Sequence, residues 1–289
     1  MPSAEKIRWG AERRLEFIEF RLYWEGGIRR ADITEKFGVS VPQASADIGA
    51  YQLTAPSNLV YDASEKRYVS TPDFRPVFLD LSAESYLVHL RDAAEDRVRL
   101  VDSWLGSTPS VAVMPLPSRR VKSDVLRSLV TAIRETRSVE VLYQSMNKEN
   151  TEKTWRRLSP HSLVNDGARW HVRAYCSKAS AYRDFLLSRC EEAKNIGPAE
   201  GLVVDDKSWN ELFEVLICPN PKLTEFQKKG IAEDYGMIDG KMSIRVRKAL
   251  LFYFEKILRL DVPEIEGKPA ATPLRMMNGE EFRKALQDV

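Results

Sequence analysis

The segment from residue 30 to residue 48 constrains the fold of this chain more than any other stretch. Its apolar residues Ile33 and Phe37 lie four positions apart on one helical face, Gly38 permits a turn, and Ser40 is a suitable N-cap for a second helix. Two short helices joined in this way form the helix-turn-helix arrangement, whose second helix enters the major groove of DNA. An ordinary helical hairpin inside a larger domain is the alternative that this segment alone leaves open.

The second helix carries the residues that we expect to meet DNA. Ala44 and Ile48 point back into the core, which is expected to leave Val41, Gln43, Ser45, Ala46 and Asp47 toward solvent. All of these except Asp47, together with the N-cap residue Ser40, are expected to contact DNA. Of these, Gln43 is the expected base reader, because its carboxamide can pair with N6 and N7 of adenine. The free N–H groups at the start of the helix are suited to hold a phosphate.

A β-hairpin is expected directly after this helix, in the place of the wing of a winged helix. Residues 59–69 contain two β-prone runs joined by a polar turn, which makes the plain helical hairpin less attractive. We expect Lys66 and Arg67 in this hairpin to contact backbone phosphate, as well as Arg29 and Arg30 near the first helix. Such contacts position the protein on DNA and do not specify sequence.

Charge is segregated along the chain, although the net charge is only +2. Residues 1–80 carry 11 basic and 12 acidic side chains, so we expect one copy to bind DNA weakly and a homodimer on an inverted repeat to be needed. Residues 118–190 carry 15 basic and 7 acidic side chains, and 11 of the 15 are Arg, which captures phosphate or carboxylate bidentately. This middle segment is therefore expected to hold an anionic ligand or, alternatively, to present a solvated cationic face.

Four β-prone runs in the basic segment predict a small antiparallel barrel or sheet. They span residues 138–145, 153–164, 168–176 and 182–190. Period-two alternation places Arg173 on one face of the third run, and Arg183 with Arg189 on one face of the fourth. We expect these three arginines to converge on one ligand, with Ser145 and His161 as further hydrogen-bond partners. The alternative for each arginine is a solvated position on an outer face.

The length of 289 residues predicts two or three domains. Helices are expected at residues 83–105 and 123–136, with a proline-rich loop at 106–117 between them. The C-terminal segment mixes β-prone and helical stretches, which indicates a small α+β module. The predicted domains span residues 1–80, 118–200 and 201–289, and residues 81–117 are a predicted helical linker between the first two.

The middle segment contains a family signature. Trp170-His-Val172 stands where WYL domains have a Trp-Tyr-Leu triplet, within the longer pattern Arg157-Leu-Ser-Pro-His161, Gly167-Ala-Arg-Trp-His-Val-Arg-Ala-Tyr175 and Tyr182-Arg-Asp-Phe185. The whole chain resembles the WYL-domain transcriptional regulators of bacterial anti-phage defence operons, of the BrxR and CapW type. Residues 216–223, 231–237 and 244–251 resemble the C-terminal WCX extension of these regulators.

The resemblance implies an α+β multidomain fold: a winged helix-turn-helix, a barrel-like (Sm-like) WYL domain and a C-terminal WCX domain that contributes to dimerisation. It also implies a homodimeric repressor that senses a nucleotide or nucleic-acid fragment. The family's ligand pocket corresponds here to Tyr143, Ser145, His161, Arg173, Arg183 and Arg189. His171 replaces the usual Tyr of the triplet, so the identity of the ligand does not carry over.

Several function classes lack their sequence signatures. The three cysteines form no CxxC pair, and no apolar run approaches the roughly 18 residues that span a bilayer. The three histidines have no HExxH spacing, and nucleotide-binding glycine motifs are absent from the sequence. We therefore expect a cytoplasmic protein without enzymatic activity, metal or cofactor. The alternative to a ligand-responsive repressor is a constitutive nucleic-acid-binding protein whose basic barrel grips single strands without switching.

Overall fold

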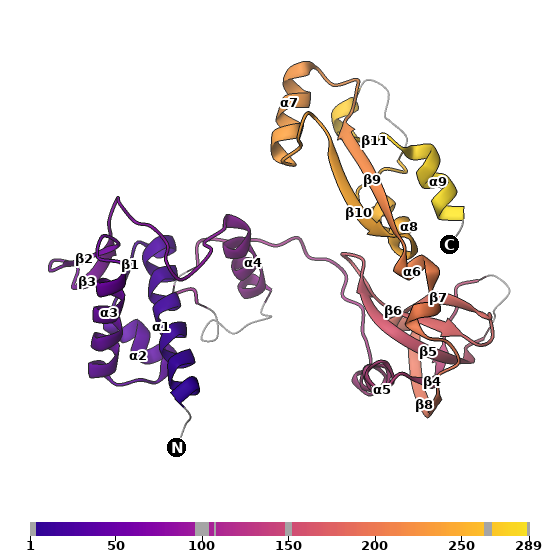
Figure 1. The fold of residues 1–289 in the computed structure, drawn as a ribbon, viewed down its shortest axis with the longest axis horizontal. Coiled ribbons are helices and arrows are strands. Elements are labelled where there is room, and N and C mark those ends of the chain that lie inside the picture. The colour runs from indigo at the N-terminus through magenta and orange to yellow at the C-terminus, as the bar shows by residue number, and fades with distance from the viewer. Residues whose placement is uncertain (1–3, 96–103, 107, 148–151, 263–267, 288–289) are drawn as a thin grey trace. The chain divides into compact units, whose positions relative to one another are not determined.

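The computed structural model describes residues 4–95, 104–106, 108–147, 152–262 and 268–287. The chain divides into two compact units, Met1–Leu116 and Pro117–Val289 (Figure 1). The finer division into three domains and a helical linker remains a prediction.

The first unit is a winged helix-turn-helix. In chain order it contains α1 (Ala4–Glu25), β1 (Gly27–Ile28), α2 (Arg30–Phe37), α3 (Val41–Thr54), β2 (Leu59–Asp62), β3 (Arg67–Ser70) and α4 (Ala83–Ala94). The three short strands form an antiparallel sheet in the order β1-β3-β2. Helices α1, α2 and α3 share a core that includes Phe17, Ile33 and Ile48. The predicted helix-turn-helix and wing are confirmed.

Local backbone chemistry produces the turn between α2 and α3. Gly38 has φ 64°, a left-handed conformation that costs glycine little. Ser40 then caps α3, and its Oγ accepts a hydrogen bond from the backbone N–H of Gln43 at 3.3 Å. The partly buried Val39 packs against the core between the two helices.

A buried carboxylate holds the chain that follows the wing against α1. Glu19 is fully buried, and its carboxylate accepts backbone N–H groups of residues 77–79 at 2.7–2.8 Å. The Tyr51 hydroxyl donates to the same carboxylate at 3.1 Å. Helix α4 ends at Ala94, and Leu105 lies outside any helix, so the expectation of one helix through residue 105 is wrong at its end. Residues 96–103 of that expectation lie outside the described residues.

The second unit begins with a helix on a curved five-stranded antiparallel sheet. The elements are α5 (Ser123–Arg134), β4 (Arg137–Tyr143), β5 (Thr154–Asn165), β6 (Trp170–Cys176), β7 (Ala181–Leu186), η1 (Leu187–Arg189) and β8 (Cys190–Pro198). The strand order is β7-β6-β5-β4-β8. Tyr143 on β4 accepts a hydrogen bond from the Leu186 N–H at the end of β7 at 3.3 Å, although these strands are not neighbours, so the sheet curls like a barrel. Helix α5 packs Val125 and Leu129 into the core of the sheet.

The rest of the second unit is the expected α+β module. It contains η2 (Val203–Asp205), α6 (Lys207–Asn210), β9 (Leu212–Pro219), α7 (Glu225–Asp234), β10 (Met242–Arg247), η3 (Lys248–Leu250), α8 (Leu251–Ile257), η4 (Pro269–Ala271), β11 (Leu274–Met276) and α9 (Gly279–Gln287). Its antiparallel sheet has the order β10-β9-β11, with Ile217, Leu251 and Phe282 in the core.

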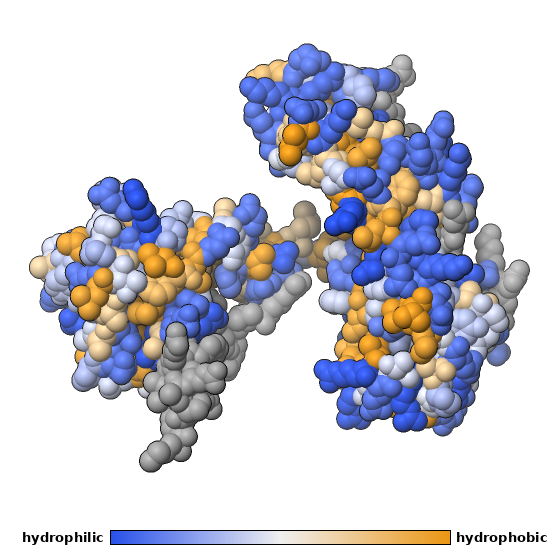
Figure 2. Space-filling view, in the orientation of Figure 1, coloured by the Kyte–Doolittle hydropathy of each residue, from blue (hydrophilic) through white to orange (hydrophobic). Residues whose placement is uncertain are grey.

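Hydrophilic residues cover most of the face drawn for each unit in Figure 2, and smaller hydrophobic patches lie between them. Among the described residues, none of the helices combines the length and apolar character needed to cross a membrane.

Candidate functional site

The residues of α3 that were expected to face solvent are exposed in all but one position. Val41, Gln43, Ser45 and Ala46 are exposed, as is the N-cap Ser40, whereas Ala44 and Ile48 are buried. These side chains project from a helix that is held rigidly by the three-helix core. Their role in contacting DNA remains a prediction.

Asp47 does not face solvent, and that expectation is wrong. Its side chain is only 6% exposed because Arg14 of α1 binds it, with Nε at 2.6 Å and Nη2 at 3.2 Å from the two carboxylate oxygens. The Gln43 amide also donates to Asp47 at 3.0 Å. Asp47 therefore ties α3 to α1 and orients the carboxamide of the expected base reader.

The cations expected to contact phosphate lie near the wing. Arg29, Arg30 and Lys66 are exposed, and the Arg30 guanidinium donates to the Tyr68 hydroxyl of β3 at 3.2 Å. Arg67 instead pairs with Glu65 in the turn, which reduces its availability to DNA.

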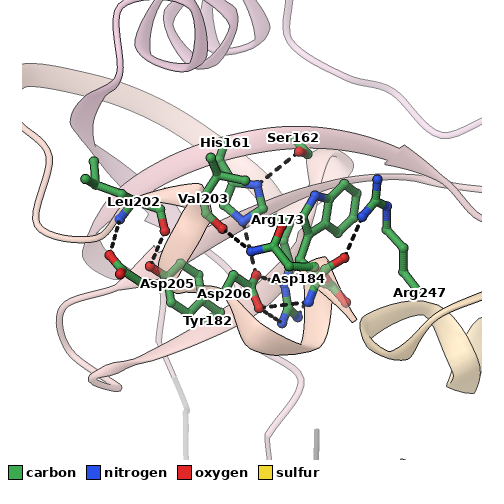
Figure 3. Close-up of polar contacts among 12 residues, drawn as sticks. His161, Ser162, Arg173, Tyr182, Asp184, Leu202, Val203, Asp205, Asp206 and Arg247 are labelled. Carbon is green, nitrogen blue, oxygen red and sulfur yellow. Dashed lines mark hydrogen bonds and ion pairs between the residues drawn. The ribbon is translucent and has the colours of Figure 1, made fainter. Parts of the chain in front are cut away.

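In the second unit, Arg173 on β6 is the centre of a buried ion-pair network. The side chain is 4% exposed, and it donates from Nε and Nη2 to the two carboxylate oxygens of Asp206 at 2.8 and 3.0 Å (Figure 3). Nη1 lies 3.4 Å from Asp184, the residue opposite Arg173 on β7. Two carboxylates therefore neutralise an arginine that we expected to bind a ligand anion.

Asp206 holds three groups at once. It accepts from Arg173, forms the N-cap of α6 by accepting the Trp209 N–H at 3.1 Å, and lies 3.1 Å from Nε2 of His161. Burial by itself would raise the pKa of Asp206, but the bonds and charge of Arg173 outweigh burial, so its pKa is below the ordinary value. Asp206 is thus a charged carboxylate inside the protein.

His161 is neutral in this arrangement. Burial lowers its pKa from the ordinary value and outweighs the opposing effect of Asp206. The neutral ring can donate from Nε2 to Asp206 and accept at Nδ1 from the Ser162 hydroxyl, which lies 3.0 Å away. His161 therefore acts as a polar connector and not as a second cation.

The network continues to helix α8. Asp184 accepts a hydrogen bond from the Tyr253 hydroxyl at 3.1 Å, and the Tyr253 ring lies 4.9 Å from the ring of His171. His171 in turn lies 3.0 Å from the Asp166 carboxylate. The histidine that replaces the usual Tyr of the triplet is therefore buried between the β5–β6 turn and α8.

We call the set His161, Arg173, Asp184, Asp206 and Tyr253 the junction. It joins the curved sheet to the C-terminal module, because Asp206 precedes α6 and Tyr253 lies on α8. Arg247 at the end of β10 extends this connection through a 2.6 Å hydrogen bond to the Trp209 carbonyl (Figure 3). A change at Arg173 can thus reach the C-terminal sheet through Asp206, the backbone of α6 at Trp209, and Arg247.

The three arginines expected to share one ligand do not converge. Residue 173 pairs with residue 184 across β6 and β7, and Ala174 pairs with Arg183. Because successive residues of a strand face opposite sides, Arg173 and Arg183 lie on opposite faces of the sheet. Their relative placement depends on the strand register, which alternation within each run does not reveal.

The remaining predicted ligand residues gather at the end of β4. Tyr143 is 8% exposed and hydrogen-bonded to Leu186, and the Gln144 N–H donates to the Arg189 carbonyl at 3.1 Å. Ser145 follows on the same segment. Apart from Arg183, which is exposed on the face opposite Arg173, the predicted pocket residues therefore divide between this end of β4 and the junction. Their role in binding a ligand remains a prediction.

Other cations of the middle segment are also paired within the chain. Arg157 bonds to Glu140 at 2.8 Å, and Lys122 and Lys153 both bind Glu191, at 3.0 and 3.3 Å. These pairs reduce the positive charge that the sheet could offer to a nucleic-acid strand. They therefore argue against the alternative in which the basic barrel binds single-stranded nucleic acid without switching.

Catalytic and metal-binding chemistry find little support in the described residues. They include no group of three or more His, Cys, Asp and Glu residues that could hold a metal ion. All three cysteines are unpaired, and burial raises the pKa of the Cys190 thiol to about 12, so this thiol is un-ionised and a poor nucleophile at neutral pH.

Three family models match successive parts of the chain. The BrxR transcriptional regulator winged helix-turn-helix domain matches residues 10–92, the WYL domain matches residues 124–195, and the BrxR transcriptional regulator C-terminal dimerization domain matches residues 212–282.

Relatives are similar over nearly their full length. A DNA-binding transcriptional repressor CapW of Escherichia coli is 44% identical over 280 residues, covering 97% of this chain and 93% of the relative. Repressors of the same name from Pseudomonas aeruginosa and Stenotrophomonas maltophilia are 42% and 38% identical, covering 97% and 99% of this chain and 93% and 95% of their own length.

Proposed function

Because the chain belongs to the BrxR and CapW family of DNA-binding transcriptional repressors, we propose that it represses a phage-defence operon by binding an inverted-repeat operator as a homodimer. We further propose that an anionic nucleotide or oligonucleotide changes its operator affinity. The exposed face of α3 carries the DNA-binding part of this proposal, since its small and polar side chains stand on a helix anchored by a buried core.

The matched C-terminal dimerization domain supports a homodimer. Two recognition helices related by two-fold symmetry would occupy two half-sites, which compensates for the near-neutral charge of each winged helix. A repressor must reach the chromosome, so we place this activity in the cytoplasm. No catalytic step is part of the proposal.

The junction supports the second part of the proposal, that an anionic ligand changes the operator affinity. It connects the sheet with the module matched to dimerisation through ion pairs and hydrogen bonds that a bound anion would disturb. An effector can shift operator affinity only to the extent that it binds the two arrangements of the dimer unequally.

The test begins with selection of operator sequences from a random DNA pool by the full chain, followed by fluorescence anisotropy on the selected inverted repeat. We expect the isolated half-site to bind at least tenfold more weakly than the full repeat. Adding short single-stranded oligonucleotides or mononucleotides should change the affinity for the repeat. Equal binding of all DNA sequences would overturn the repressor assignment, whereas sequence-specific binding that no bound anion alters would remove only the responsive part.

A further inference from the structure

Two adjoining cavities lie where the β5–β6 turn meets helix α8. One has a volume of about 280 Å³ and the other about 260 Å³, and Asp166, Tyr253 and Ile257 line both. We propose that together they form a binding site for a small organic anion, with its phosphate or carboxylate in the first cavity and its apolar body in the second. This inference rests on the proposed function, because it assigns a location to the effector.

The first cavity is lined by three cations. Arg119, Arg169 and Lys256 border it, together with a single carboxylate from Asp166. Arg169 is bound to Asp166 at 2.9 Å, and Lys256 to Asp261 at 2.6 Å. Even with both carboxylates counted, the five ionised groups sum to +1.

Arg119 supplies the unbalanced charge. It is exposed, and within the part of the chain that the structure describes no hydrogen bond or ion pair engages its guanidinium. Arginine binds phosphate and carboxylate bidentately. The first cavity therefore favours an anionic group over a neutral or cationic one.

The second cavity is mainly apolar. Its lining includes Val164 of the sheet and Val246, Leu250, Phe254 and Ile257 of the C-terminal module. An inorganic ion would gain nothing from these side chains, whereas a ring or short hydrocarbon joined to the anionic group would be removed from water there. The pair of cavities thus fits an organic anion better than free phosphate.

Gly167 brings the two walls together. A Cβ atom at this position would lie 2.2 Å from Cδ1 of Ile257, and the backbone has φ 88°. The positive φ favours glycine at the tip of the β5–β6 turn, whereas the contact is with the end of the Ile257 side chain, which could move to make room. The recess therefore depends on close contact between this turn and α8.

Occupancy of the site would be communicated directly to the junction. Tyr253 lines both cavities, and its hydroxyl donates to Asp184, which pairs with Arg173. A ligand there touches the curved sheet through Arg169 and the C-terminal module through Lys256, so its binding depends on their separation. Arg173 was predicted to bind the ligand, but its guanidinium is already paired with Asp184 and Asp206. It would therefore transmit the signal without touching the ligand.

Isothermal titration calorimetry on the full chain tests the site with three probes: adenosine 5′-monophosphate, adenosine and inorganic phosphate. We expect the monophosphate to bind at least tenfold more tightly than either part. Ile257→Glu places a negative charge at the wall shared by both cavities, and should weaken binding by tenfold or more. Arg119→Ala should weaken it about tenfold, the usual loss for one charge-assisted contact. Both positions are exposed, so neither substitution should affect folding.

Arg127→Ala is the matched control, because Arg127 is an exposed arginine on α5. Unchanged monophosphate affinity in Ile257→Glu and Arg119→Ala, or absence of monophosphate binding to the wild-type chain at millimolar concentration, overturns the site. If the monophosphate binds as expected but leaves operator affinity unaltered, the site stands and the responsive part of the proposed function fails. If oligonucleotides change operator affinity equally in wild type and Ile257→Glu, the responsive function stands and this site fails.

Discussion

Asp206→Ala is the substitution that most directly tests the junction. The wild-type carboxylate accepts two hydrogen bonds from Arg173, at 2.8 and 3.0 Å, and also caps α6. Removing one partner of a buried ion pair usually costs about 3–5 kcal/mol, because the other charge remains buried. Asp184 still lies 3.4 Å from Arg173, so we expect the lower end, about 3 kcal/mol.

This cost should appear as local opening. The second unit contains two cores that a single unfolding midpoint would not separate, whereas amide hydrogen exchange reports on each segment. A loss of about 3 kcal/mol corresponds to exchange about a hundredfold faster in residues 203–210. Asp205→Ala is the control. Asp205 is an exposed neighbour whose carboxylate accepts a hydrogen bond from the Leu202 N–H and not from Arg173.

Two results would refute the reasoning. If exchange in residues 203–210 accelerates equally in both variants, Asp206 does not hold the segment through Arg173. If Asp206→Ala is more stable than wild type, the desolvation of the buried pair exceeds its attraction, which is known for some buried pairs. Acid gives an independent check: the folded pKa of Asp206 is lowered, so its contribution is present above its ordinary value of 3.8 and is lost as pH falls through the folded pKa.

Three further predictions address other parts of the molecule. Gln43→Ala should relax base preference at one position of each half-site by about 1–3 kcal/mol, whereas Lys66→Ala should weaken all sequences alike and flatten the salt dependence; competition anisotropy distinguishes them. His161 has a lowered pKa, so wild-type stability should fall as pH drops below 6.5, because the unfolded state binds more protons; in His161→Gln, urea titrations should show a flatter pH profile. Phe226 on α7 is 88% exposed within the region matched to dimerisation, so Phe226→Asp should shift the protein towards monomer in sedimentation velocity and weaken operator binding; an unchanged dimer would place the interface elsewhere.

The winged helix could be predicted from the sequence because its signals are local. Gly38 at the turn, the cap at Ser40 and the inward spacing of Ala44 and Ile48 all lie within eleven residues of one another, and the structure has each as expected. The one error, Asp47, arose from a partner on another helix. Position 47 lies three residues after Ala44 and thus borders the core, where Arg14 of α1 reaches it.

The junction could not be predicted in the same way, because its partners are distant in sequence. Asp206 meets Arg173 across 33 residues, and Tyr253 meets Asp184 across 69. Asp184 could have been found from the strands alone, had the register of β6 on β7 been known. No local pattern identifies Asp206, since an aspartate before a one-turn helix is common at surfaces.

The excess of positive charge in the middle segment has a different meaning once its pairs are known. A count of charges treats each arginine as available, but a buried arginine with two carboxylates attracts a further anion only if the anion displaces one of them. Such displacement breaks the existing hydrogen bonds between arginine and carboxylate. The incoming anion therefore binds with net affinity only when it makes additional contacts. Arg119 requires no displacement, because no described side chain pairs with it. An effector would therefore make its first contact with Arg119 in the first cavity. The buried ion pairs of Arg173 would then determine how strongly that contact shifts the C-terminal module.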